Sequence, residues 1–109
     1  MAGPAILILD EPCAGLDPVA REHFLQFLER LGRKPQAPTL VLVTHHVEEI
    51  MPVFTHALLL RSGRAVAAGS KADVLSSRLV SWTFDASVRL HASHGRYSLS
   101  VAPNRGVVI

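Results

Sequence analysis

Two short apolar runs, separated by about thirty residues, constrain the fold of this chain more than any other feature. Residues 5–9 (AILIL) form a continuous run rich in isoleucine and leucine, and residues 39–44 (TLVLVT) form a second run with β-branched residues. Continuous apolar runs of this length are typical of strands that are buried on both faces of a parallel sheet. We therefore expect two neighbouring parallel strands, which must be joined by a crossover connection.

The segment between the two runs has the pattern of one helix. Asp17 followed by Pro18 matches an N-cap and a first helical position, and apolar side chains then recur at helical spacing up to residue 31. Gly32 follows as a stop signal. A strand, a helix over 18–31 and a second strand predict a right-handed parallel βαβ unit, and hence an α/β fold.

The second half of the chain favours hairpins. After a short helical stretch around residues 47–51, residues 56–70 contain two runs separated by Ser62 and Gly63, which predicts a β-hairpin. Ser70 with Asp73 resembles a capping box, and it predicts a short helix that ends near Ser77.

From residue 79 onward the sequence alternates between apolar and polar residues, which predicts a second hairpin with Gly95 in its loop. This change of pattern divides the chain into residues 1–79, the main body, and residues 80–109, a small carboxyl-terminal β appendage.

Composition narrows the class of protein. With 109 residues, of which 49% are hydrophobic and 18% charged, the chain is of globular type with one modest core. Its net charge of +2 is spread along the sequence without a basic stripe, which argues little for nucleic acid as a partner. The single Cys13 fits a reducing compartment, and each apolar run is far shorter than the roughly 20 residues that span a bilayer. We expect a cytoplasmic protein whose contact with a membrane, if it has one, is made through a partner.

Chemically versatile side chains follow each of the two predicted parallel strands. Asp10 and Glu11 come directly after the first run, and Thr44, His45 and His46 come at the end of the second. In open α/β sheets, ligands bind beyond the carboxyl ends of the strands, so these residues could face one site. One carboxylate there can hold Mg²⁺, a second can deprotonate a water molecule, and a histidine can stabilise a transferred phosphoryl group. Two acids and a histidine make a set suited to phosphoryl transfer.

These residues resemble a known family. Residues 6–11 (ILILDE) are similar to the Walker B strand of an ATP-binding-cassette (ABC) ATPase, residues 14–17 (AGLD) to its D-loop, and Thr44-His45 to its switch-histidine loop. The order and spacing of these motifs match over roughly residues 4–77. The combination is much more specific than any one motif.

The resemblance implies a role for four residues. Asp10 would act at Mg²⁺, Glu11 as the catalytic base, Asp17 at the contact between two ATPase domains, and His45 at the γ-phosphate of ATP. It implies ATP and Mg²⁺ as cofactors, a second ABC ATPase domain and a transmembrane permease subunit as partners, and a location on the inner face of the membrane through that permease. Nucleic acid is not favoured.

The sequence also departs from the family pattern. It contains neither a G-x-x-x-x-G-K-[ST] phosphate loop nor an LSGGQ signature segment. The resemblance therefore implies a partial P-loop NTPase-like fold, with residues 1–79 as the carboxyl-terminal part of a nucleotide-binding domain. The missing amino-terminal half would carry the two absent motifs, and this fragment alone would be inactive. Cys13, Ala14 and His46 stand where Thr, Ser and Asp are usual, and Ala14 lacks a hydroxyl for an inter-subunit hydrogen bond.

Simpler interpretations remain open for each motif. The acids could be solvated groups in a turn, Asp17 could serve only as a helix cap, and the adjacent histidines could be polar loop residues that lack the spacing of a helical zinc pair. For the whole chain, two alternatives to a transporter ATPase remain. One is a non-catalytic dimerising or regulatory module, and the other is a soluble ABC ATPase that acts on nucleic acid or ribosomes.

Overall fold

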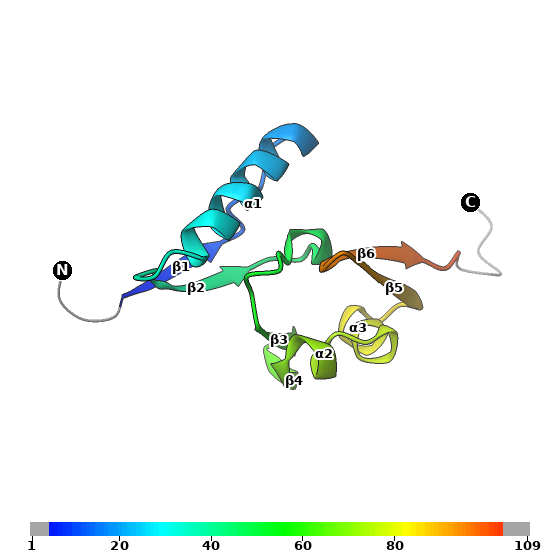
Figure 1. The fold of residues 1–109 in the computed structure, drawn as a ribbon. Coiled ribbons are helices and arrows are strands. Elements are labelled where there is room, and N and C mark those ends of the chain that lie inside the picture. Colours follow the sequence, from blue (N-terminus) through cyan, green and yellow to red (C-terminus); the bar gives the residue numbers. More distant parts are fainter. Residues whose placement is uncertain (1–4, 104–109) are drawn as a thin grey trace. The chain divides into compact units, whose positions relative to one another are not determined.

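The computed structural model describes residues 5–103, and the chain divides between Phe54 and Thr55 into two compact units. The elements of the first unit are β1 (Ile6–Asp10), α1 (Pro18–Gly32), β2 (Thr39–Val43) and the short 3-10 helix η1 (Val47–Glu49). Those of the second are β3 (His56–Arg61), β4 (Arg64–Ser70), α2 (Lys71–Val74), α3 (Ser77–Phe84), β5 (Val88–Ser93) and β6 (Arg96–Val101) (Figure 1). The predicted α/β class is confirmed.

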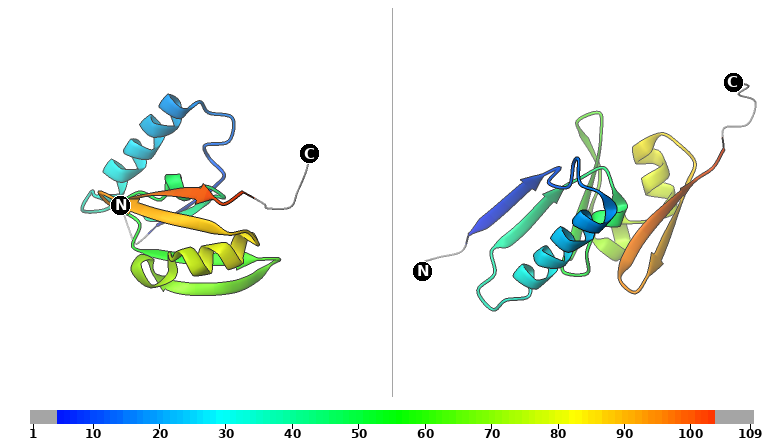
Figure 2. Two further views of the ribbon diagram at one scale, coloured as in Figure 1. Left: turned by 90° about the vertical axis from the view of Figure 1, so that its right-hand side faces the viewer. Right: turned by 90° about the horizontal axis from the view of Figure 1, so that it is seen from above.

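In the first unit, β1 and β2 pair in parallel and are joined through α1. The register places Ile6 opposite Thr39 and Asp10 opposite Val43. Helix α1 lies over one face of this pair (Figures 1 and 2). Because the strands are parallel, the two segments that follow them begin at the same edge of the sheet.

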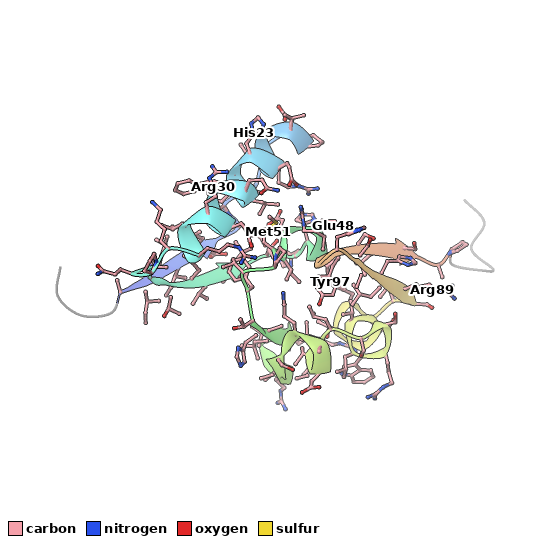
Figure 3. All side chains as sticks on the ribbon, viewed as in Figure 1. His23, Arg30, Glu48, Met51, Arg89 and Tyr97 are labelled. Atoms are coloured by element: carbon pink, nitrogen blue, oxygen red, sulfur yellow. The ribbon has the colours of Figure 1, made fainter. Side chains whose placement is uncertain are left out.

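A small apolar core joins α1 to the segments on either side of it. The buried residues Cys13, Leu25 and Met51 form this core, and the partly buried side chains of Phe24, Val53 and Phe54 pack against it. Met51, labelled in Figure 3, belongs to the segment after η1. Cys13 belongs to the loop after β1, so one cluster holds both loops against the helix.

Gly32 lies at a close approach between α1 and the rest of the unit. A Cβ atom at this position would lie 2.5 Å from Cγ2 of Val53 and 3.2 Å from Cδ1 of Leu40. The sequence predicted Gly32 as a stop signal, whereas the helix includes it as its last residue. The absence of a side chain lets the end of α1 approach β2 and Val53 closely.

Among the described residues of the first unit, no element covers the face of the β1–β2 pair opposite α1, and most side chains on this face are apolar. Side chains alternate along both strands between exposed and half-buried positions, and the exposed apolar residues are Ile6, Ile8, Val41 and Val43. The sequence pattern is typical of strands that are covered on both faces, whereas α1 covers only one. An open apolar surface of this kind favours association with another surface.

The second unit contains two antiparallel hairpins, β3–β4 and β5–β6. Both turns have two central residues with positive φ, Ser62-Gly63 (52° and 74°) and His94-Gly95 (53° and 75°), as in type I′ turns. Both hairpins were predicted from the sequence, including the turn at Ser62-Gly63 and the place of Gly95 in the second loop. The Oγ atom of Ser70 accepts a hydrogen bond from the N–H of Asp73, which is the predicted cap of α2.

Helix α3 was not predicted. The expected alternation from residue 79 is wrong up to residue 84, because Ser76 caps a helix there by accepting a hydrogen bond from the N–H of Leu79. Val80 is fully buried, and the hydroxyl of Ser81 bonds both backbone groups of Val88. The predicted limit between residues 79 and 80 falls inside this helix. As the limit of the ABC-like part of the chain, it stays a prediction.

The open face predicts self-association of the 109-residue chain. We expect sedimentation velocity to show oligomers that grow with concentration, and Ile8→Lys to shift the chain toward the monomer because it places a charge on this face. Val101→Lys is the matched control, since Ile8 and Val101 are both 65% exposed and lie on different strands. A wild-type chain that stays monomeric at every concentration would contradict this expectation.

Candidate functional site

The two acids at the carboxyl end of β1 lie beside the segment that follows β2. The ladder places Asp10 opposite Val43, and the N–H of Glu11 then donates to the carbonyl of Val43 at 2.8 Å. This hydrogen bond extends the pairing one residue beyond β1. It places Glu11 next to the residues that follow Val43.

The side chains of Glu11 and His45 meet at this edge. The Nε2 atom of His45 is 3.2 Å from the Oε1 atom of Glu11. This oxygen is buried and makes no hydrogen bond within the described residues, so the two atoms lie close together without an aligned hydrogen bond. The imidazole itself is 82% exposed. A buried acceptor that lacks a donor can receive one from a water molecule.

The backbone of Glu11 has an uncommon conformation. Its φ of +49° lies in the left-handed region, which glutamate adopts rarely. Such conformations cost roughly 1–3 kcal/mol and are concentrated at functional sites, where the surrounding structure holds them. The hydrogen bond from the Glu11 N–H to Val43 supplies part of that restraint.

Asp10 ends β1 on the open face of the sheet, where it is exposed. Among residues 5–103, no three His, Cys, Asp or Glu side chains gather closely enough to enclose a metal ion. Mg²⁺ usually takes only one or two carboxylates and fills its other positions with water and substrate phosphates. A single carboxylate such as Asp10 therefore suits magnesium better than a metal that needs a full set of protein ligands.

Asp17 is the N-cap residue of α1. Its Oδ1 atom accepts a hydrogen bond from the N–H of Ala20 at 2.8 Å, and Pro18 occupies the first turn. The predicted cap is thus present, and it uses one of the two carboxylate oxygens. The contacts described for Asp17 lie within its own helix and do not include Glu11 or His45.

Cys13 anchors the loop between the acids and α1. Its side chain is 5% exposed and packs with Leu25 and Met51. Burial, and next the nearby carboxylate of Glu49, raise the pKa of the Cys13 thiol. The thiol is therefore neutral at physiological pH, which suits a packing role rather than a nucleophilic one.

Sequence reasoning missed a hydrogen bond between a partly buried hydroxyl and a buried carboxylate in the loop after β2. The hydroxyl of Thr44 donates to Oε1 of Glu49 at 2.7 Å, and Glu49 is only 2% exposed. The available signal was the apolar character of Val47, Ile50 and Met51, which surround Glu49 in sequence and draw this short helical turn inward.

A surface hollow of about 550 Å³ in the second unit contains none of the candidate residues and is lined by Val66, Arg78, Leu79, Ser81 and Trp82.

Known proteins resemble this chain over most of its length. No protein-family model matches the chain. The ABC transporter ATP-binding protein YlmA of Bacillus subtilis, itself uncharacterised, is 43% identical over 90 residues, which are 83% of this chain and 34% of YlmA. The chain is a homologue of ABC transporter ATP-binding proteins. The protein YmeB of Lactococcus lactis is 37% identical over 94 residues, which are 86% of this chain and 36% of YmeB.

Two further proteins match, one a relative whose name gives its substrate and the other a solved structure. The molybdenum import ATP-binding protein ModC of Brucella abortus is 38% identical over 74 residues, which are 68% of this chain and 20% of ModC. An inward-facing structure described as a metal-chelate type ABC transporter matches with a TM-score of 0.71 and 18% identity, over 93% of this chain and 40% of the matched one. This likeness concerns the fold alone. The chain thus spans about a third of the length of the relatives YlmA and YmeB.

Within residues 5–103, the structure has no helix that is both long and apolar enough to cross a membrane.

The raised pKa of Cys13 predicts slow alkylation. We expect iodoacetamide labelling of the folded chain to reach half its maximal rate at a pH above the ordinary thiol pKa of about 8.5, since only the thiolate reacts. Met51→Ala, which removes one wall of the buried cluster, should speed the reaction, and Cys13→Ser should abolish it. A folded chain that reaches half its maximal rate at or below pH 8.5 would contradict the assignment.

Proposed function

We propose that this chain supplies the carboxyl-terminal, catalytic part of an ATP-hydrolysing domain in an ABC transporter. The observation that carries the proposal is the buried Oε1 of Glu11, which makes no hydrogen bond within the described residues and lies 3.2 Å from Nε2 of His45, at the carboxyl ends of two paired strands. Homology to ABC transporter ATP-binding proteins supports the same reaction. A carboxylate whose oxygen makes no hydrogen bond of its own suits a base that accepts a proton from an attacking water.

Each candidate residue has one role in this proposal. Glu11 orients and deprotonates the attacking water, and His45 donates a hydrogen bond to the transferred phosphoryl group, which its exposed imidazole can reach. Asp10 is the residue that would hold Mg²⁺, which when bound neutralises charge on the phosphates. The pairing of β1 with β2 brings the side chains of Glu11 and His45 to the same edge of the sheet.

The exposed Asp17 at the start of α1 suggests where a partner binds. Asp17 is exposed and its cap uses Oδ1, so we propose that the rest of its carboxylate contacts a second ABC ATPase domain. A transmembrane permease subunit would hold the pair of domains at the inner face of the membrane, with the chain on the cytoplasmic side. The import of molybdenum belongs to the name of ModC, and no substrate is transferred from it to this chain.

The proposal requires two motifs that these 109 residues do not contain, a phosphate loop and a signature segment. The backbone N–H groups and the lysine of a phosphate loop compensate most of the triphosphate charge. Without them, the carboxylates of Asp10, Glu11 and Asp17 repel that charge. We propose that a further polypeptide segment supplies both motifs, and that the 109-residue chain by itself does not hydrolyse ATP.

A hybrid protein tests the role of Glu11. In this hybrid, residues 1–109 replace the matching segment of YlmA. We expect MgATP hydrolysis by the hybrid, and we expect Glu11→Gln to lower turnover by about 10² to 10⁴ while ATP binding is retained, because the amide keeps the size of the side chain and removes the base.

Glu22→Gln on α1 is the matched control, since the same chemical change there lies outside the site, and its turnover should be unchanged. Loss of ATP binding in Glu11→Gln would show that Glu11 is not the base. A wild-type hybrid that binds ATP without hydrolysing it, while YlmA itself hydrolyses ATP, would favour the non-catalytic module instead.

The two adjacent histidines should differ in the same hybrid. His45→Ala should lower the maximal ATPase rate by about 10² to 10³, the usual loss for one donor to a developing negative charge. His46→Ala should cost much less, because His45 rather than His46 contacts Glu11. Rates are compared at saturating MgATP after circular dichroism has shown that both variants fold. Equal losses, or a larger loss for His46→Ala, would mean that the assignment is wrong by one residue.

A further inference from the structure

The loop that carries His45 is closed by a buried carboxylate that none of the roles above uses. Glu49 is 2% exposed, and its Oε1 accepts a hydrogen bond of 2.7 Å from the hydroxyl of Thr44. The same hydroxyl oxygen accepts a hydrogen bond of 3.0 Å from the N–H of His46. One hydroxyl therefore connects the backbone on the far side of His45 to a fixed point in the protein interior.

A further set of backbone bonds closes the loop from the other side. The N–H of Glu49 donates to the carbonyl of His46 at 3.0 Å, and the N–H of Ile50 donates to the carbonyl of Val47. The residues on both sides of His45 are thus held, whereas the imidazole of His45 is largely exposed. Since little packing surrounds this imidazole, the backbone must determine where it lies.

The end of the same segment is held by another buried carboxylate. The Oε1 atom of Glu29 on α1 accepts a hydrogen bond of 2.8 Å from the N–H of Val53, and its Oε2 atom accepts one of 2.6 Å from Nε of Arg33. Glu29 is 9% exposed. The segment from residue 44 to residue 53 is therefore fixed near both ends, which makes the position of its exposed histidine reproducible.

A buried carboxylate is costly unless hydrogen bonds compensate its lost hydration. At Glu49 a small apolar side chain would fill the turn at lower cost, so the carboxylate calls for another explanation. We propose that Thr44 and Glu49 are positioning residues: Glu49 fixes the Thr44 hydroxyl, the hydroxyl fixes the His46 amide, and His45 is thereby held beside Glu11. This inference rests on the proposed function of His45. Catalytic geometry is sensitive enough for this to matter, because a displacement of about 1 Å can lower a rate by about 10²-fold.

The test uses the hydroxyl of Thr44 in the hybrid protein. Thr44→Val removes the hydroxyl at nearly constant size, and Thr44→Ser retains it. We expect Thr44→Val to lower kcat by about 10- to 10²-fold with little change in the KM for ATP, and Thr44→Ser to retain most of the activity. Thr83→Val is the matched control, because it removes another intramolecular hydroxyl bond, the one to the carbonyl of Leu79, in the second unit. It should leave kcat unchanged.

Two readouts separate positioning from general stability. If Thr44 acts through His45, adding Thr44→Val to His45→Ala should lower kcat no further, whereas losses that multiply overturn the proposal. Independently of activity, amide exchange measured by NMR should show that the His46 N–H loses protection in Thr44→Val and keeps it in Thr44→Ser.

The amide measurement also separates the two proposals. If His45→Ala leaves kcat unchanged, the proposed role of His45 fails. Loss of His46 amide protection in Thr44→Val alone would then still support the positioning role of Thr44 and Glu49. If the His46 amide is equally protected in Thr44→Val and in the wild type, that positioning role is overturned whatever the rates.

Discussion

The parallel pairing of β1 with β2 is the interaction on which the rest of the candidate site depends. Its register sets Asp10 opposite Val43, and the hydrogen bond from the N–H of Glu11 to Val43 carries the pairing into the loops. Because side chains alternate along a strand, a shift of one residue would turn each side chain to the other face. Glu11 and His45 would then no longer meet. Sheet register and site geometry are therefore one constraint.

Helix α1 makes this arrangement rigid. Its buried Leu25 packs with Cys13 from the loop after β1 and with Met51 from the segment after β2, and fully burying a leucine side chain contributes roughly 1.5–3 kcal/mol. Glu29 on the same helix holds the backbone of Val53. Both loops thus rest on one helix. The open opposite face of the sheet contributes nothing to this core, which explains why the first unit combines an ordered site with a surface that favours association.

Local chemistry could be predicted from the sequence, and long-range packing could not. The cap at Asp17 and the two hairpin turns depend on a few neighbouring residues, so their patterns are visible in the sequence. The left-handed backbone of Glu11 depends on Val43, a residue 32 positions away. In the same way, α3 and the burial of Glu49 depend on contacts that no local pattern contains. The roles of Asp10, Glu11, Asp17 and His45 came from the resemblance, and they stay predictions.

The most direct test of the account is a crystal structure of the hybrid protein with Mg²⁺ and a non-hydrolysable ATP analogue. The account predicts the metal at the carboxylate of Asp10, a water between Glu11 and the γ-phosphate, and Nε2 of His45 within about 2.7–3.2 Å of a γ-phosphate oxygen. A nucleotide bound away from the ends of β1 and β2, or His46 in the place assigned to His45, would contradict it.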